Sequence, residues 1–139
     1  MDRRLAFLTA FLGFTAVALG AMGAHGVKAA VLGLPDAMDR LGWWDTGAKY
    51  HALHVVAVGL VAVMSAHVTG RFAWLAAVFF TAGIILFSGS LYVMALTGVR
   101  TLGAVTPFGG LSFLVGWLAF GIAARGLGRV KEAPRPGEP

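Results

Sequence analysis

The stretch FAWLAAVFFTAGIILFSGSLYVMALT, residues 72–97, decides the fold class of this chain. It carries no charged side chain, and it is longer than the roughly 20 residues that a helix needs to cross the hydrocarbon core of a bilayer. In lipid, such a segment must satisfy every backbone polar group internally, which a helix does. Residues 72–97 are therefore predicted to form a transmembrane helix.

Three further apolar runs follow the same pattern, at about residues 5–24, 48–67 and 107–124. Only 12% of the 139 residues are charged, about half of the share of charged residues in a typical soluble domain. We predict an all-α membrane protein with four transmembrane helices in an up-down bundle over residues 1–127. The polar, proline-rich residues 128–139 are predicted to be a disordered tail. A signal peptide is the alternative for the first run, but its apolar part is long enough to span a membrane.

The segment between the first two runs, residues 25–47, is the only substantial loop predicted. Asp36 is placed to cap a short helix that starts at Ala37, and the adjacent Trp43 and Trp44 suit the headgroup region. We predict a short interfacial helix lying on the membrane between the first and second transmembrane helices. A partly buried re-entrant segment is the alternative. Thr106 is likewise expected to cap the fourth helix, with Pro107 in its first turn.

Basic residues predict the orientation, because cytoplasmic loops carry an excess of Lys and Arg. An even number of spans places both termini on one side. Seven basic residues share that side, namely Arg3, Arg4, Arg71, Arg125, Arg129, Lys131 and Arg135. Four lie on the other side, namely Lys28, Arg40, Lys49 and Arg100. Both termini are therefore predicted to be cytoplasmic.

Composition also excludes several functions. The net charge of +5 comes from basic residues at the ends of apolar runs, where they meet lipid headgroups, so nucleic-acid binding is not expected. Cysteine is absent, which removes disulfides, thiolate metal sites and iron–sulfur clusters. The 20 glycines predict close helix packing, for example at the small-residue spacing of Ala16, Gly20 and Ala24.

Four motifs resemble a known family. They are GAMGAHG at residues 20–26, KYHALH at 49–54, FSGSLY and ALTG at 87–92 and 95–98, and TPFGG at 106–110 followed by Gly116-Trp117. In this order they resemble the domain-of-unknown-function 423 family, small bacterial inner-membrane proteins related to transmembrane protein 256. The resemblance implies a multi-pass protein of the bacterial inner (plasma) membrane with no established activity. His51 departs from the family pattern, which more often has an amide residue there.

Polar residues gather in one half of the predicted bundle, on the side away from the termini. Polar side chains at membrane depth usually face the bundle interior and often mark a site. We expect one cluster centred on His54, which shares a helical face with Tyr50 and His51. The candidate residues are His25, Lys49, Tyr50, His51, His54, Ser88, Ser90, Tyr92 and Thr106.

Three interpretations of this cluster stay open. The first is interhelical hydrogen bonding alone. The second is binding or transport of a small ligand, lipid or quinone. The third is a metal site of His25, His51 and His54, since imidazole suits zinc and copper; a haem held by His25 and His54 is a weaker variant.

No cofactor is expected. The predicted spans carry no carboxylate to orient an imidazole, so no enzyme is expected either. The chain is interpreted as an accessory or structural component of a membrane assembly. Its expected partners are the lipid bilayer and other membrane proteins or further copies of itself.

Overall fold

The computed structural model describes residues 2–68 and 71–127, and this part of the chain is helical apart from short connections. The predicted tail, residues 128–139, lies outside the described residues. Among the described residues, four helices are long and apolar enough to cross a membrane: Arg3–Val31, Ala37–Met64, Arg71–Thr97 and Arg100–Ala124. The predicted all-α class and the four spans are therefore confirmed.

The first span is longer than predicted. It consists of α1 (Arg3–Met22), a π-helical turn η1 (Gly23–Val27) and α2 (Lys28–Val31). Asp2 begins it, because its carboxylate accepts a hydrogen bond from the Arg4 backbone N–H at 2.8 Å. The first helix was predicted to end near residue 24, but in lipid the backbone must remain hydrogen-bonded, and the π-helical turn Gly23–Val27 continues it.

The second span corrects the predicted interfacial helix. A helix does begin at Ala37, but it runs without interruption to Met64 as α3, 28 residues long. Trp43 and Trp44 therefore lie in the first turns of the spanning helix. Asp36 occupies the predicted capping position, but its side chain forms no capping hydrogen bond to the backbone; its carboxylate accepts from Arg40 Nε at 2.9 Å instead.

The third span joins α4 (Arg71–Gly83), a second π-helical turn η2 (Ile84–Ser88) and α5 (Gly89–Thr97). It ends at the predicted residue because Gly98 adopts the left-handed conformation, with φ of 75°, which glycine accepts without strain. The fourth span begins with the 3₁₀ turn η3 (Arg100–Ala104) and continues as α6 (Thr106–Ala124). Thr106 is its first residue and not its cap, and Val105 in the capping position offers no side-chain hydrogen bond.

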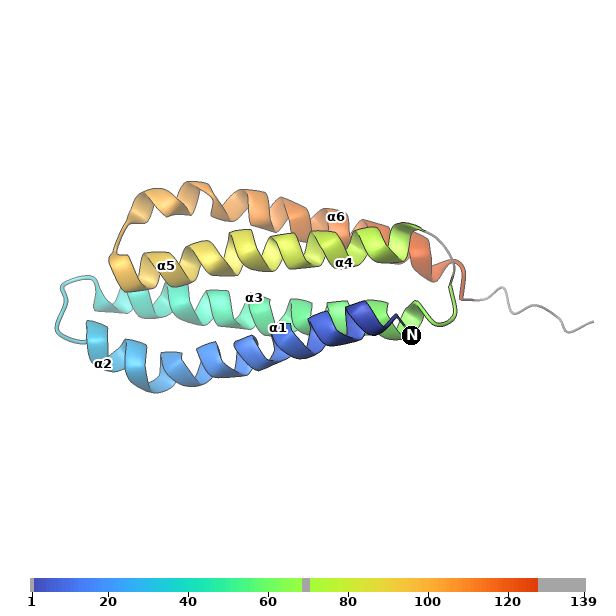
Figure 1. The fold of residues 1–139 in the computed structure, drawn as a ribbon. Coiled ribbons are helices and arrows are strands. Elements are labelled where there is room, and N and C mark those ends of the chain that lie inside the picture. The colour runs from blue at the N-terminus through green and yellow to red at the C-terminus, as the bar shows by residue number, and fades with distance from the viewer. Residues whose placement is uncertain (1, 69–70, 128–139) are drawn as a thin grey trace, which may run out of the picture.

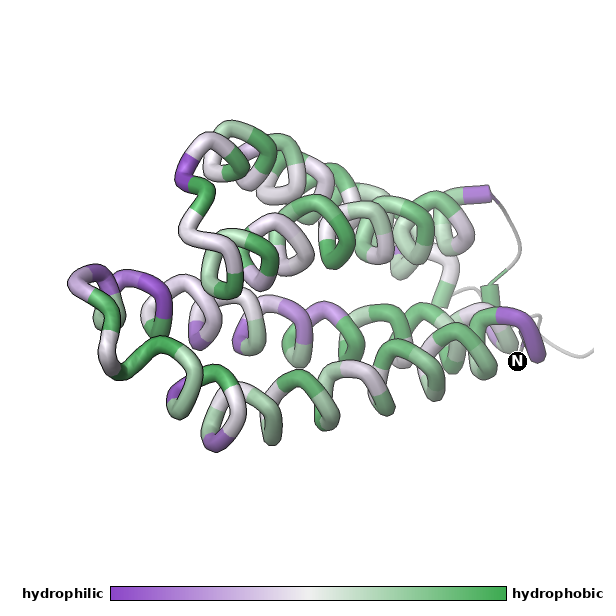
Figure 2. The backbone as a smooth tube through the Cα atoms, turned by 60° about the vertical axis from the view of Figure 1, so that its left-hand side comes forward, coloured by the Kyte–Doolittle hydropathy of each residue, from purple (hydrophilic) through white to green (hydrophobic). Residues whose placement is uncertain are grey.

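The four spans run up and down beside one another (Figure 1). α3 packs against α1 on one side and against α4 and α5 on the other, while α6 packs mainly on α4 and η2. The core between them contains Val58, Val61, Ala76 and Phe80, which are almost fully buried. Hydrophilic residues gather toward the two ends of the bundle, and the middle is largely hydrophobic (Figure 2).

The two ends of the bundle differ in what they carry. The terminal end holds the N-terminus, the α3–α4 connection and the end of α6; the loop end holds the α2–α3 and α5–α6 connections (Figure 1). The start of α1 and the end of α6 therefore lie on the same side of the bundle, as an even number of spans requires.

Candidate functional site

The predicted polar residues lie in the loop half of the bundle, mostly between α3, α5 and α6. The π-helical turn η2 lies in this half and inserts one extra residue into the third span. Such turns are frequent at functional sites because they rotate the residues that follow them. Ser88, at the end of η2, is fully buried.

His54 forms the first group with α6. Its Nδ1 lies 2.8 Å from the Tyr50 carbonyl, and Trp117 Nε1 donates to His54 Nε2 at 3.3 Å. Its ring stacks on Phe113, with centroids 3.4 Å apart and planes inclined by 9°. A neutral imidazole that donates from Nδ1 and accepts at Nε2 satisfies both contacts without burying charge. His54 thereby links α3 to α6 through a hydrogen bond and a ring contact.

His51 forms the second group with α5. Its Nδ1 lies 3.3 Å from the Tyr92 hydroxyl, and the Tyr92 ring in turn lies 4.6 Å from that of Trp44. The Trp44 indole N–H donates to the Leu19 carbonyl at 3.1 Å, which extends the contact to α1. Within the described residues, the second ring nitrogen of His51 has no hydrogen-bond partner.

Ser90 and Thr106 form the third group, which links the start of α5 to the start of α6. Their hydroxyl oxygens are 2.9 Å apart, and the Ser90 hydroxyl also donates to the Phe87 carbonyl at 2.9 Å. Gly109 lies directly against the backbone of Phe87 in η2, where a side chain has no room. The Ser88 hydroxyl, one residue further along, has no partner in the part of the chain that the structure describes.

The single cluster expected around His54 is thus three separate hydrogen-bonded groups. Tyr50 enters the first group through its carbonyl, and its ring remains partly exposed beside Phe87. His25 and Lys49 are exposed and join none of the groups. Lys49 instead pairs with Asp45, four residues earlier, at 2.6 Å.

The metal interpretation is corrected by this geometry. Among residues 2–68 and 71–127, no three His, Asp or Glu side chains come together in a way that could hold a metal ion. His25 is exposed on η1, whereas His54 engages both of its ring nitrogens within the chain. A three-histidine site and a haem between His25 and His54 are therefore not formed.

Several residues that position this half of the bundle were missed from the sequence. Trp117 and Phe113 are the contacts of His54, and an indole N–H within an apolar helix is a donor that needs a buried acceptor. Arg40 Nη1 donates to the carbonyls of Ala95 and Leu96 at 3.3 and 3.2 Å, at the end of α5. Unpaired carbonyls at a helix end attract a cation, which is the signal that could have identified Arg40.

A shallow hollow of about 340 Å³ lies beside the first group, between α3 and α6. Its walls are almost entirely hydrophobic and aromatic. The lining residues are Tyr50, Leu53, His54, Phe87, Gly110, Phe113, Leu114 and Trp117. Its size and lining offer room for a small apolar molecule.

Comparison with known proteins agrees with this architecture. The family model described as "Protein of unknown function (DUF423)" matches residues 19–110. The UPF0382 inner membrane protein YgdD of Escherichia coli K12 is 43% identical over 117 residues, which cover 84% of this chain and 85% of YgdD. The UPF0382 membrane protein YwdK of Bacillus subtilis is 39% identical over 114 residues, covering 78% and 85%.

A UPF0382 membrane protein of Haemophilus influenzae is 40% identical over 119 residues, covering 86% of this chain and 91% of that protein. No solved structure matches the chain. The relatives are named as membrane proteins and the structure has four spans, so the chain is a small multi-pass membrane protein. The resemblance seen in its glycine, histidine and serine motifs is confirmed: the chain belongs to the DUF423 family, whose function is unknown.

Proposed function

We propose that the chain is a non-enzymatic component of a larger membrane assembly and that α1 is the helix that contacts its partner. The observation that carries this proposal is how little of α1 is buried. Of the residues of α1, all of which the structure describes, only Leu5 and Leu12 are buried. In the most apolar part of the first span 11% of residues are buried, against 50% in the second span.

The outward face of α1 combines large and small side chains. Phe7, Phe14 and Val17 are 77%, 73% and 75% exposed, and their spacing places them on one side of the helix. Gly20, further along α1, is also exposed, and a Cβ added to it meets nothing within 4 Å. Of the small residues that predicted a packing seam, Ala16 packs partly against the core, whereas Gly20 and Ala24 are exposed. Small residues beside large ones let a second helix approach closely.

The chemistry of the polar groups supports a non-enzymatic role. Asp39 and Asp45 do lie on the second spanning helix, but each pairs with a nearby cation, Arg100 and Lys49 respectively. Neither carboxylate orients a histidine, and His54 already uses both ring nitrogens. A nucleophile with a base and an orienting acid, which covalent catalysis needs, is not assembled among the described residues.

Photo-crosslinking in native membranes tests the proposal. A photoreactive amino acid replaces Phe7 or Phe14 on α1, and Leu111 or Leu118 on α6 as controls, which are 59% and 69% exposed. We expect discrete crosslinked protein species from the two α1 positions and only lipid adducts from the two α6 positions. Equal crosslinking from both helices, or lipid adducts alone from α1, contradicts the proposal.

We further propose that both termini face the cytoplasm of the cell, because basic residues are more frequent at the terminal end. The chain has no cysteine, so single cysteines report sidedness without background. Ala66, exposed at the α3–α4 turn, and Gly33, exposed between α2 and α3, lie at opposite ends of the bundle. A membrane-impermeant thiol reagent added to intact cells should label Gly33→Cys and not Ala66→Cys. The reverse pattern contradicts the orientation.

A second candidate function is binding of a small apolar or aromatic ligand, such as a quinone, in the hollow beside His54. The volume and aromatic lining of the hollow support it. Gly110 lines the hollow, and a Cβ there makes only ordinary contact with Phe87, at 3.9 Å. Gly110→Leu should therefore occupy the hollow without disturbing the bundle. If a ligand accompanies the purified protein, this variant should lose it; retention of the ligand excludes the hollow as its site.

A further inference from the structure

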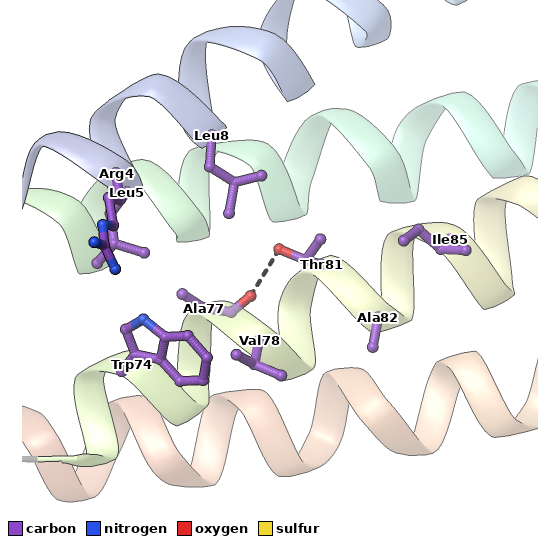
Figure 3. Close-up of a pocket in the computed structure, with 9 residues that line it drawn as sticks. All are labelled: Arg4, Leu5, Leu8, Trp74, Ala77, Val78, Thr81, Ala82 and Ile85. Carbon is purple, nitrogen blue, oxygen red and sulfur yellow. Dashed lines mark hydrogen bonds between the residues drawn. The ribbon is translucent and has the colours of Figure 1, made fainter.

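A second and larger hollow lies at the other half of the bundle, between α1 and α4 (Figure 3). Its volume is about 400 Å³, and it is lined by Arg4, Leu5, Leu8, Trp74, Ala77, Val78, Thr81, Ala82 and Ile85. It exists because α1 and α4 both pack on α3, and because Ala77 and Ala82 leave room beside α4. This groove between α1 and α4 takes no part in the three polar groups described above.

The walls of the groove are apolar. Its one hydroxyl, that of Thr81, donates to the Ala77 carbonyl at 2.8 Å and so presents only its methyl group (Figure 3). The rise from Trp74 to Ile85 along a helix is about 16 Å. That length is close to half of the roughly 30 Å hydrocarbon core. The groove therefore matches the depth of one leaflet, which is the length of one lipid acyl chain.

Charge is concentrated at one end of the groove. Arg4 and Trp74 lie there together, and Ile85 lies at the opposite end (Figure 3). Within residues 2–68 and 71–127, no carboxylate pairs with the Arg4 guanidinium. The nearby carboxylate of Asp2 instead caps the Arg4 backbone N–H. The N-termini of α1 and α4, which carry partial positive charge, also lie at this terminal end.

We propose that the groove between α1 and α4 binds one anionic phospholipid of the leaflet at the terminal end. Its phosphate pairs with Arg4, beside the Trp74 indole at headgroup level. One acyl chain lies along Leu8, Ala82 and Ile85 toward the middle of the membrane. An arginine suits this role because its planar guanidinium donates two parallel hydrogen bonds to a phosphate.

The full chain, purified in a mild detergent, is titrated with dioleoyl phosphatidylglycerol or dioleoyl phosphatidylcholine, and binding is followed by native mass spectrometry. Arg4→Gln should weaken phosphatidylglycerol binding about fivefold, the factor that one basic residue contributes beside an anionic lipid. The matched control is Arg3→Gln, since Arg3 is also exposed but does not line the groove; it should change binding less than twofold. If the two substitutions weaken phosphatidylglycerol binding equally, the lipid is attracted by general surface charge and not by the groove, and the proposal is overturned.

The acyl-chain part of the proposal is tested separately. Ala82→Phe fills the groove and should weaken binding of both lipids at least fivefold, whereas Ala52→Phe, at an exposed position of α3 away from the groove, should leave both unchanged. Unaltered binding to Ala82→Phe overturns the site. Two results overturn the assignment to an anionic lipid: phosphatidylcholine binds as tightly as phosphatidylglycerol, or inorganic phosphate alone binds the chain as tightly as phosphatidylglycerol.

Discussion

The close approach of α6 to η2 is tested by two neighbouring glycines of α6 that differ only in what they face. A Cβ built at Gly109 falls within 2.7 Å of the Phe87 Cα and still closer to the Phe87 backbone nitrogen, so the helices must separate. At Gly110 the nearest atoms belong to the Phe87 ring, at an ordinary 3.9 Å. We therefore expect Gly109→Ala to destabilise the protein and Gly110→Ala to be tolerated.

The magnitude follows from two opposing effects. Overpacking a close contact costs about 1–3 kcal/mol, and replacing a helical glycine by alanine gains up to about 1 kcal/mol. With the alanine gain of about 1 kcal/mol subtracted, Gly109→Ala should lower the free energy of unfolding by up to about 2 kcal/mol. Gly110→Ala gains the same alanine preference without the clash, so it should range from neutral to about 1 kcal/mol more stable.

The assay is reversible unfolding in mixed micelles, in which a denaturing detergent is titrated against a mild one and helicity is followed by circular dichroism. The two variants share their helix and their chemical change, so the difference between them isolates the contact with Phe87. If Gly109→Ala is as stable as Gly110→Ala, the described approach of α6 to η2 is wrong. The Ser90–Thr106 hydrogen bond, which depends on that approach, is then also in doubt.

Two further predictions concern single polar contacts. Trp117→Phe removes the indole N–H donated to His54 together with part of the ring. It should therefore cost at least the roughly 0.6 kcal/mol typical of a hydrogen bond between membrane helices in the same unfolding assay; no loss of stability means that the bond contributes nothing. The hydrogen bond from Arg40 lowers the pKa of Asp36 below its ordinary value of 3.8. The stability that this hydrogen bond gives the folded chain is therefore complete above pH 3.8 and is lost as the pH falls through the lower pKa. An NMR titration of the Asp36 carboxyl should show that pKa, and Arg40→Gln should return it toward 3.8; an unchanged pKa in that variant contradicts the assigned cause.

The four spans could be predicted because apolar length is a local property of the sequence. The ends of the first two spans could not, because long-range contacts decide them. Arg40 binds carbonyls at the end of α5, and Trp44 binds the Leu19 carbonyl. These two contacts hold the segment predicted as an interfacial helix in line with the rest of α3. Neither contact can be read from spacing along one helix.

The candidate site was predicted at the level of composition and not of contacts. Polar residues were expected in one half of the bundle, because the up-down order fixes their depth. Which of them meet depends on the rotation of each helix, and the π-helical turn in η2 alters that rotation before Ser90 and Tyr92. In the structure His54 meets Trp117 of α6 rather than the serines of the third span.

The central claim, that α1 contacts a partner within the membrane, is tested most directly by complex size after gentle extraction. Gly20 on α1 and Gly121 on α6 are both exposed, and a Cβ added to either meets nothing within 4 Å. Gly20→Leu and Gly121→Leu should therefore leave the single chain equally stable. Native gel electrophoresis of membranes extracted in a mild detergent should show a complex larger than one chain for the wild type and Gly121→Leu, and its loss for Gly20→Leu. A wild-type protein that migrates as a single chain, or a complex that survives Gly20→Leu unchanged, contradicts the claim.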